Sequence, residues 1–230
     1  MANFSVVLLT AAPAGQGAEA GGAFQKIDGR EALLRSVELF LNRDDIKQIQ
    51  LVVTNDEMEE TKRKFGAHLS FSGVKLLGAG ARWLEQAAAA KTIAADVTHV
   101  ILHDAARPIV PYSDIDALMQ EAQKHEAVAL AAPVRTTLVE VDEGGNPMAY
   151  HLPRSFMQLL TPQAFTKARF LEMTTSGREL HPSLVTLLKG SPLNIRLGGP
   201  GDAGTAKAML NMLPKPKVKG PTSPFEEAQW

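Results

Sequence analysis

The stretch Val97-Thr98-His99-Val100-Ile101-Leu102-His103-Asp104-Ala105-Ala106-Arg107-Pro108 joins an apolar run to a polar turn near the middle of the chain. The run at residues 97–102 is typical of a strand buried on both faces of a parallel sheet. An aspartate just past such a strand can hold a divalent cation, and an arginine three residues on can bind a phosphate or carboxylate in bidentate fashion. This pairing suits phosphoryl chemistry, although Asp104 alone is equally well explained as a turn or helix N-cap residue.

Similar apolar runs recur on both sides of this stretch and alternate with segments of helical spacing. The alternation predicts a doubly wound, mostly parallel α/β sheet formed by one domain over residues 1–213. The expected strands are residues 4–9, 49–53, 74–77, 97–102, 127–133 and 193–197, and the expected helices are residues 30–41, 56–65, 83–95, 115–124, 164–174 and 203–213.

Loops that follow the strands are the candidate ligand sites, because ligands in such folds bind outside the carboxyl ends of the strands. Residues 10–23 are small and glycine-rich, and their backbone N–H groups could cradle a phosphate, although a plain flexible loop fits them equally well. Residues 78–82 place Arg82 at a helix entrance, where a solvated arginine is the commoner case. Together with residues 104–107, these loops are expected to converge.

Residues 136–152 read as a β-hairpin with an explicit turn at residues 142–147. A lone two-stranded ribbon is marginally stable by itself, so this arm is expected to pair with a second subunit and form a homodimer. From residue 214 the composition changes to proline, lysine, glycine and serine, which predicts a flexible tail over residues 214–230.

The overall composition argues against several classes of protein and of functional site. The 24 lysine and arginine residues nearly balance the 25 aspartate and glutamate residues, so no broad basic face indicates nucleic acid as a partner. The absence of cysteine excludes disulfides, thiolate nucleophiles and cysteine-bound zinc, and it fits a cytoplasmic location. The apolar run at residues 4–10 is too short to span a membrane, so we expect no membrane association.

Several motifs in order resemble the 2-C-methyl-D-erythritol 4-phosphate cytidylyltransferases, also called 4-diphosphocytidyl-2-C-methyl-D-erythritol synthases. The most specific is the hexapeptide at residues 103–108, and the resemblance runs from about residue 6 to residue 213. The supporting motifs are Gly29 to Glu38, Gly78-x-x-x-Arg82, Ala132-Pro-Val-x-x-Thr137, Arg154 with Thr161-Pro-Gln163, and Asn194-Ile-Arg196.

This resemblance implies a Rossmann-like, nucleotide-diphospho-sugar transferase fold and a reaction in isoprenoid precursor biosynthesis. CMP would pass from CTP to 2-C-methyl-D-erythritol 4-phosphate, or to a related sugar or polyol phosphate, with Mg²⁺ as cofactor and pyrophosphate as the second product. It also implies site residues. Nucleotide contacts would come from Ala11, Ala12, Gly15, Gly17, Gly80, Arg82 and Ala105, substrate contacts from Asp104, Arg107, Thr137, Arg154 and Thr161, the metal ligand from Asp104, and catalytic cations from Arg196 and Lys26.

The chain departs from the family pattern around its first loop. Pro13 replaces a glycine, and no basic residue lies between Met1 and Gln25, so Lys26 is the nearest cation. Glu85 stands where the family has a serine, and no aspartate lies between Asp142 and Asp202. Two other readings therefore stay open: a family member that has lost turnover and acts as a binding or regulatory subunit, and a dinucleotide oxidoreductase, which lacks the expected glycine fingerprint.

Overall fold

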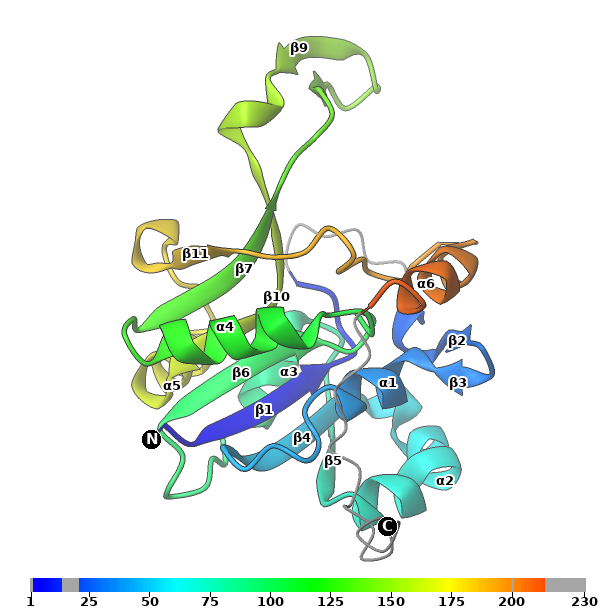
Figure 1. Cartoon of the computed structure of the whole chain (residues 1–230), viewed down its shortest axis with the longest axis vertical. Coiled ribbons are helices and arrows are strands. Elements are labelled where there is room, and N and C mark those ends of the chain that lie inside the picture. The colour runs from blue at the N-terminus through cyan, green and yellow to red at the C-terminus, as the bar shows by residue number, and fades with distance from the viewer. Residues whose placement is uncertain (1, 14–20, 200, 214–230) are drawn as a thin grey trace, which may run out of the picture.

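A mixed seven-stranded sheet forms the centre of the molecule in the computed structural model, which describes residues 2–13, 21–199 and 201–213 (Figure 1). Its strand order is β11-β7-β10-β6-β1-β4-β5. All neighbours are parallel except β10, which runs antiparallel to both β6 and β7. The strands are β1 (Phe4–Leu9), β4 (Ile46–Thr54), β5 (Val74–Ala79), β6 (His99–Asp104), β7 (Ala127–Pro133), β10 (Met157–Thr166) and β11 (Thr186–Lys189).

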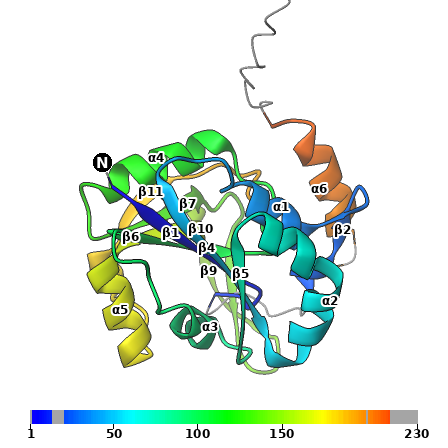
Figure 2. The same cartoon turned by 90° about the horizontal axis from the view of Figure 1, so that it is seen from below.

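Helices cover both faces of this sheet (Figure 2). Successive side chains of a strand point to opposite faces, and β1 shows this directly: Val6 and Leu8 pack with α1, α2 and α4, whereas Val7 and Leu9 pack with α3 and α5. A strand buried on both sides is mostly apolar, and β1 is apolar except for Ser5, while the predicted strand at residues 97–102 is apolar from Val100 to Leu102. The helices are α1 (Ala32–Glu38), α2 (Asn55–Phe71), α3 (Trp83–Ala89), α4 (Tyr112–Ala122), α5 (Lys167–Ser176) and α6 (Asp202–Leu210), with short 3-10 turns η1 (Gly22–Phe24), η2 (Pro153–Ser155) and η3 (Pro182–Leu184).

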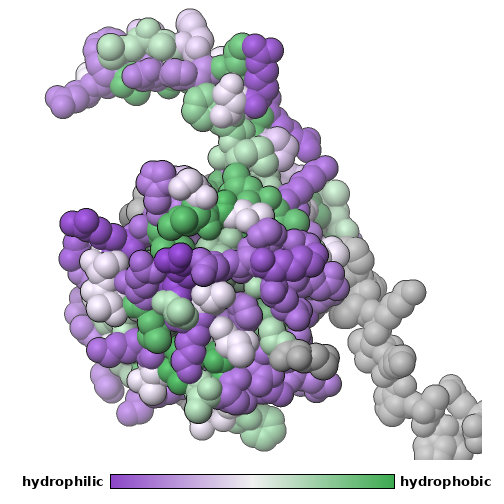
Figure 3. Space-filling model, turned by 90° about the vertical axis from the view of Figure 1, so that its left-hand side faces the viewer, coloured by the Kyte–Doolittle hydropathy of each residue, from purple (hydrophilic) through white to green (hydrophobic). Residues whose placement is uncertain are grey.

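The predicted hairpin is β8 (Leu138–Val141) paired with β9 (Pro147–His151), and it projects away from the sheet (Figure 1). Its turn is closed by Asp142, whose Oδ1 accepts a hydrogen bond of 2.8 Å from the backbone N–H of Asn146. A small separate ribbon, β2 (Lys26–Ile27) with β3 (Arg30–Glu31), lies between the first loop and α1. Apolar surface continues from the arm to its base (Figure 3), where Leu152, Phe156, Met157 and Leu159 are exposed.

The last part of the sheet differs from the sequence-based expectation. Residues 193–197 were predicted as a strand, but they form no strand, and the backbone N–H of Leu197 bonds to the carbonyl of Ala106 at 2.8 Å. The two strands that complete the sheet, β10 and β11, were missed. β10 was not recognised in the sequence, because Pro162 interrupts its strand pattern at a break in register between Leu159 and Gln163.

Helix boundaries differ for local reasons. The helix expected at residues 164–174 begins at Lys167, because β10 continues to Thr166, whose hydroxyl accepts a hydrogen bond from the N–H of Arg169 at 3.3 Å. The helix expected at residues 83–95 ends at Ala89.

Within the described residues no helix is long and apolar enough to cross a membrane. The predicted tail at residues 214–230 and the expected nucleotide contacts Gly15 and Gly17 lie outside the described residues.

Candidate active site

The candidate site lies at the carboxyl edge of the sheet, where the predicted loops converge. β1 pairs in parallel with β6 and β4, and β4 pairs with β5, so the ends of these strands meet at one edge. Leu9 lies beside Asp104, and the N–H of Ala105 donates to the carbonyl of Leu9 at 2.8 Å. The first loop and the turn after Asp104 therefore start from adjacent strands, and the segment with Gly80 starts from β5, which is separated from β1 by β4.

Asp104 is fully buried, and both of its carboxylate oxygens are engaged. Oδ1 accepts from the N–H of Ala106 at 2.9 Å, and Oδ2 accepts from Nε of Arg196 at 2.9 Å. Nε of Arg107 lies 3.6 Å from the same Oδ2. One carboxylate thus holds two guanidinium groups, which leaves the cluster with a net positive charge when all three groups are ionised.

Burial and the neighbouring charges shift the pKa values of Asp104 and Arg107 in opposite directions. Burial raises the pKa of the Asp104 carboxyl, while Arg196, the Ala106 N–H and Arg107 oppose that shift. Burial likewise lowers the pKa of the Arg107 guanidinium, and Asp104 opposes it. Each charge compensates for the desolvation of the other. Removing Asp104 would leave the buried Arg107 guanidinium without its compensating carboxylate, whereas removing Arg107 would leave Asp104 paired with Arg196.

The side chain of Arg107 is buried, and a residue distant in the sequence holds it in place. Its Nη1 donates to the carbonyl of Asn194 at 2.8 Å, and Nδ2 of Asn194 donates to the carbonyl of Thr161 at 2.6 Å. Asn194 is itself almost fully buried. Residues 193–197, which were predicted as a strand, therefore hold the side chain of Arg107 through Asn194 and place Arg196 beside Asp104.

The part of the edge next to the first loop and α3 is more open. The N–H of Ala11 donates to Oε1 of Gln86, a buried side chain of α3, at 2.9 Å. Arg82 is 83% exposed and is held by Glu85, with Nε donating to Oε1 at 2.7 Å. A Cβ on Gly80 would meet the Glu85 carboxylate, so a larger residue there would displace the end of that flexible side chain.

Sequence comparison identifies the family. The 2-C-methyl-D-erythritol 4-phosphate cytidylyltransferase family matches residues 5–212. The chain belongs to this family. Cytidylyltransferases of that name from Rhodopirellula baltica and Bacillus pumilus are 31% and 24% identical to it, each over 89% of this chain and over 94% and 96% of the relative.

Solved structures agree on the fold. The Thermus thermophilus cytidylyltransferase superposes with a TM-score of 0.69 at 23% identity, covering 89% of this chain and 98% of that one. The 4-diphosphocytidyl-2C-methyl-D-erythritol synthase from Anaerococcus prevotii gives 0.72 at 17% identity, with coverage of 91% and 96%. The expected nucleotidyltransferase fold is confirmed.

The remaining expected site residues of this cytidylyltransferase family member lie apart from Asp104. Lys26 is exposed on β2, and its Nζ lies 3.5 Å from Oε1 of Glu31. Thr137 lies at the start of the arm and Arg154 in η2 at its end, and both are exposed. Asn194 and Gln86 were not selected from the sequence, although Asn194 lies in a motif that was noted and Gln86 is an uncharged polar residue in an alanine-rich helix.

The residues present do not form a Mg²⁺ site at Asp104. The carboxylate is fully buried, and its oxygens accept hydrogen bonds from Ala106 and Arg196. Mg²⁺ requires accessible oxygen ligands and is commonly bound by one or two carboxylates together with substrate phosphates. Among the described residues no group of three or more histidine, aspartate or glutamate side chains could hold a metal ion.

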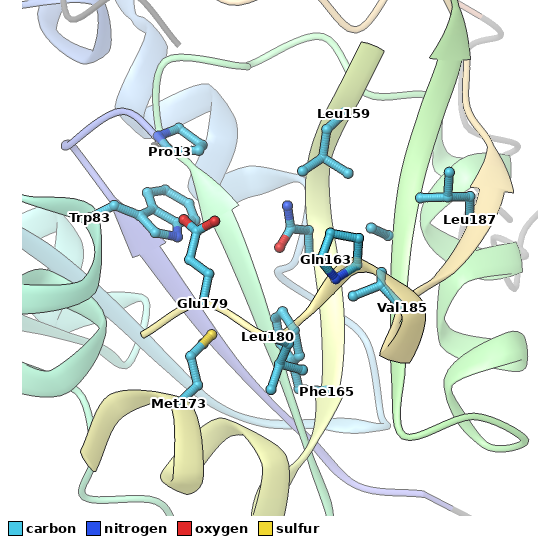
Figure 4. A pocket seen from close by; sticks show the side chains of 12 residues that line it. Pro13, Trp83, Leu159, Gln163, Phe165, Met173, Glu179, Leu180, Val185 and Leu187 are labelled. Carbon is cyan, nitrogen blue, oxygen red and sulfur yellow. The ribbon is translucent and has the colours of Figure 1, made fainter. Parts of the chain in front are cut away.

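A mostly apolar cavity of about 240 Å³ lies between α3, α5 and the α5–β11 segment (Figure 4). Pro13 and Trp83 lie on one side and Leu187 on the other. The Glu179 carboxylate and the Gln163 amide are polar groups in its lining. Through Pro13 and Gln163 the cavity adjoins the first loop and the Thr161 segment.

Proposed function

We propose that this chain transfers CMP from CTP to the phosphate of 2-C-methyl-D-erythritol 4-phosphate and releases pyrophosphate, in isoprenoid precursor biosynthesis. The family match over residues 5–212 supports this assignment. The observation that carries it is the Asp104–Arg107–Arg196 cluster at the carboxyl edge of the sheet, where two guanidinium groups are held on one buried carboxylate.

The reaction is a substitution at phosphorus. An oxygen of the acceptor phosphate would attack the α-phosphorus of CTP, and the bond from that phosphorus to the oxygen bridging to the β-phosphate would break. Pyrophosphate would leave with that oxygen and the bonding electrons. Catalysis of this kind depends on positioning and on stabilising the negative charge that develops on the phosphoryl oxygens.

Arg196 is the cation best placed for that task. Its side chain is 12% exposed, and Asp104 fixes its guanidinium through Nε, so further N–H groups can face a phosphate. Asp104 and Arg107 were expected to contact the acceptor, but both side chains are buried, so they would act on it by orienting Arg196, while Thr161, which is also buried, would hold this loop. Lys26 would add a second cation at the nucleotide phosphates if its ribbon moves toward the site.

The nucleotide would lie over the first loop and the segment after β5. There, we assign Ala11, Ala12, Gly15, Gly17, Gly80, Arg82 and Ala105 to nucleotide contacts. Arg82 is solvent-exposed and would exchange its contact with Glu85 for one with the nucleotide. A divalent cation such as Mg²⁺ would enter with the triphosphate, because the described residues do not fit a preformed metal site.

The arm completes the site in a homodimer. Apolar side chains exposed on β8 and β9 would be buried against a second copy, and this contact would carry Thr137 and Arg154 toward the acceptor site of the partner. An isolated two-stranded ribbon with an exposed apolar surface is expected to gain stability from such pairing.

Pyrophosphate release tests the proposal. The full chain should release pyrophosphate when CTP, Mg²⁺ and 2-C-methyl-D-erythritol 4-phosphate are all present, and omission of the acceptor should abolish release. ATP, GTP and UTP serve as controls for nucleotide choice. Absence of turnover with every nucleotide, together with little or no CTP binding by calorimetry in a chain that still dimerises, would contradict the enzyme and favour a binding or regulatory subunit.

A further inference from the structure

His103 is fully buried between the two loops of the site and is not assigned to any step above. Its Nε2 lies 3.0 Å from the carbonyl oxygen of Arg107, and its Nδ1 lies 3.1 Å from Oγ1 of Thr161. Its ring makes an edge-type contact with Phe40, which lies in the turn after α1, with ring centroids 5.4 Å apart. Both ring nitrogens are therefore satisfied by groups that belong to the active-site frame.

Thr161 contacts this histidine from just beyond the end of the β10–β6 ladder. β10 pairs with β6 from Thr166 to Gln163, and the next residue, Pro162, has no N–H to donate. Beyond it, the Thr161 hydroxyl accepts a hydrogen bond from the N–H of Asp104 at 3.1 Å. A side-chain oxygen thus serves as the acceptor for the backbone N–H of the residue that carries the site carboxylate.

The direction of each hydrogen bond follows from its partners. A carbonyl oxygen only accepts, so the Arg107 carbonyl requires a proton on Nε2 of His103. Burial, reinforced by the nearby Arg107 charge, lowers the pKa of His103 to about 3 despite that hydrogen bond, so the ring is neutral and Nδ1 carries no proton. Nδ1 must then accept the Thr161 hydroxyl proton, while the hydroxyl oxygen accepts from the Asp104 N–H.

We propose that His103 is a positioning residue for the acceptor-binding loop. As the Nε2–H tautomer, it directs a one-way chain of hydrogen bonds from the Asp104 N–H through the Thr161 hydroxyl to the imidazole and on to the Arg107 carbonyl. This chain ties the two ends of the Asp104–Arg107 turn together and sets the directions of both charged side chains. The proposal rests on the proposed function and deepens it, because it gives Thr161 and His103 a part without substrate contact.

Nitrogen chemical shifts of the histidine rings test the tautomer independently of activity. In the ¹⁵N-labelled full chain, the signals lost in a His103→Gln variant identify His103, and we expect them to report a protonated Nε2 and an unprotonated Nδ1 from pH 5 to pH 8. An Nδ1–H tautomer, or an imidazolium within that range, would overturn the proposal. This result does not depend on turnover, so its failure is distinguishable from failure of the cytidylyltransferase assignment.

Steady-state kinetics test the positioning role. Thr161→Val removes the hydroxyl and leaves the Asp104 N–H and His103 Nδ1 without their partner, so we expect the KM for 2-C-methyl-D-erythritol 4-phosphate to rise about tenfold. The KM for CTP should stay nearly constant. Thr161→Ser keeps the hydroxyl and should restore most of the acceptor KM.

Thr174→Val is the matched control, because Thr174 donates its hydroxyl proton to the Phe170 carbonyl within α5, away from this chain of bonds. A loss shared by both KM values, or one that Thr161→Ser does not restore, would indicate a general folding defect and refute the proposal.

Discussion

Nε of Arg196 lies 2.9 Å from Oδ2 of Asp104, although 92 residues separate them in the chain. The contact joins the end of a central strand to a segment that belongs to no strand or helix, and it fixes a cation at the edge of the sheet where a phosphate would bind. The negative charge of Asp104 is therefore used to orient arginines, and its two oxygens are already engaged without a metal ion.

Asp104→Asn should impair both stability and catalysis. The amide removes the charge that compensates Arg196 and Arg107, so we expect the free energy of unfolding to fall by about 3 kcal/mol. The value of kcat/KM for pyrophosphate release should fall about a hundredfold or more. Asp116→Asn is the control, because Asp116 is 55% exposed in a surface pair with Arg43 and should change stability by less than about 1 kcal/mol. Full activity in Asp104→Asn would refute this role.

Replacing Arg196 separates charge from geometry. Arg196→Gln removes the cation and should lower kcat by about two orders of magnitude. Arg196→Lys keeps the charge but loses the Nε hydrogen bond to Asp104, so an intermediate kcat is expected. Equal activity in the two variants would show that the positive charge at this position does not contribute to turnover. Pyrophosphate release at saturating CTP and acceptor gives the measurement.

Lys26→Ala tests whether this exposed lysine takes part in turnover. Its ammonium is 66% exposed and pairs weakly with Glu31, so the substitution should leave the melting temperature nearly unchanged. If Lys26 binds the nucleotide phosphates, kcat should fall about a hundredfold. Lys207→Ala is a matched control, since Lys207 is 59% exposed in a pair with Asp28. A kcat equal to that of the Lys207 variant would remove Lys26 from the catalytic residues.

The double variant Val139→Ser, Tyr150→Ser should dissociate the homodimer. These side chains face each other across the arm and are 46% and 76% exposed. Burial of their apolar area against a second copy would be lost, and sedimentation velocity should report a monomer. Phe71→Ser is the control, because Phe71 is 95% exposed at the end of α2, away from the arm, and should leave the sedimentation coefficient unchanged. A wild-type chain that sediments as a monomer would contradict the arm's proposed role.

His103 should make folding stability depend on acid pH. Its pKa is about 3 in the folded chain and 6.5 as the reference value for the unfolded chain, so the unfolded state binds the extra proton between these pH values. The stabilising contribution is therefore complete above about pH 6.5 and declines by up to about 1.4 kcal/mol per pH unit as the pH falls.

The pKa of Asp104 is raised in the folded chain and acts with the opposite sign, so the measurement must be a difference. Urea unfolding of the wild type and of His103→Gln at pH 7, 6 and 5 supplies it. The two pH dependences should diverge below pH 6.5, and parallel curves would show that His103 does not titrate as a buried neutral group.

Most of the sheet could be predicted because a strand buried on both faces needs continuous apolar sequence. β7 satisfied this rule, β1 and β6 carried apolar runs long enough to be recognised, and the arm was recognisable from its turn residues. β10 could not be recognised, because its antiparallel placement and the proline at its register break depend on neighbours that are distant in the chain. β11 is short and partly exposed at the sheet edge, so its local pattern was weak.

By itself the sequence determined the fold class, the family and the loops that meet at the carboxyl edge, because these follow from local periodicity and from motifs of adjacent residues. Only the tertiary structure decided which charged side chains pair with one another. It placed Arg196 and Arg107 on a single buried carboxylate and connected His103 to Thr161. The Arg196–Asp104 and Thr161–His103 contacts join segments far apart in the chain, and the energies of all three contacts depend on burial and on hydrogen-bond direction, which arise only when the chain has folded.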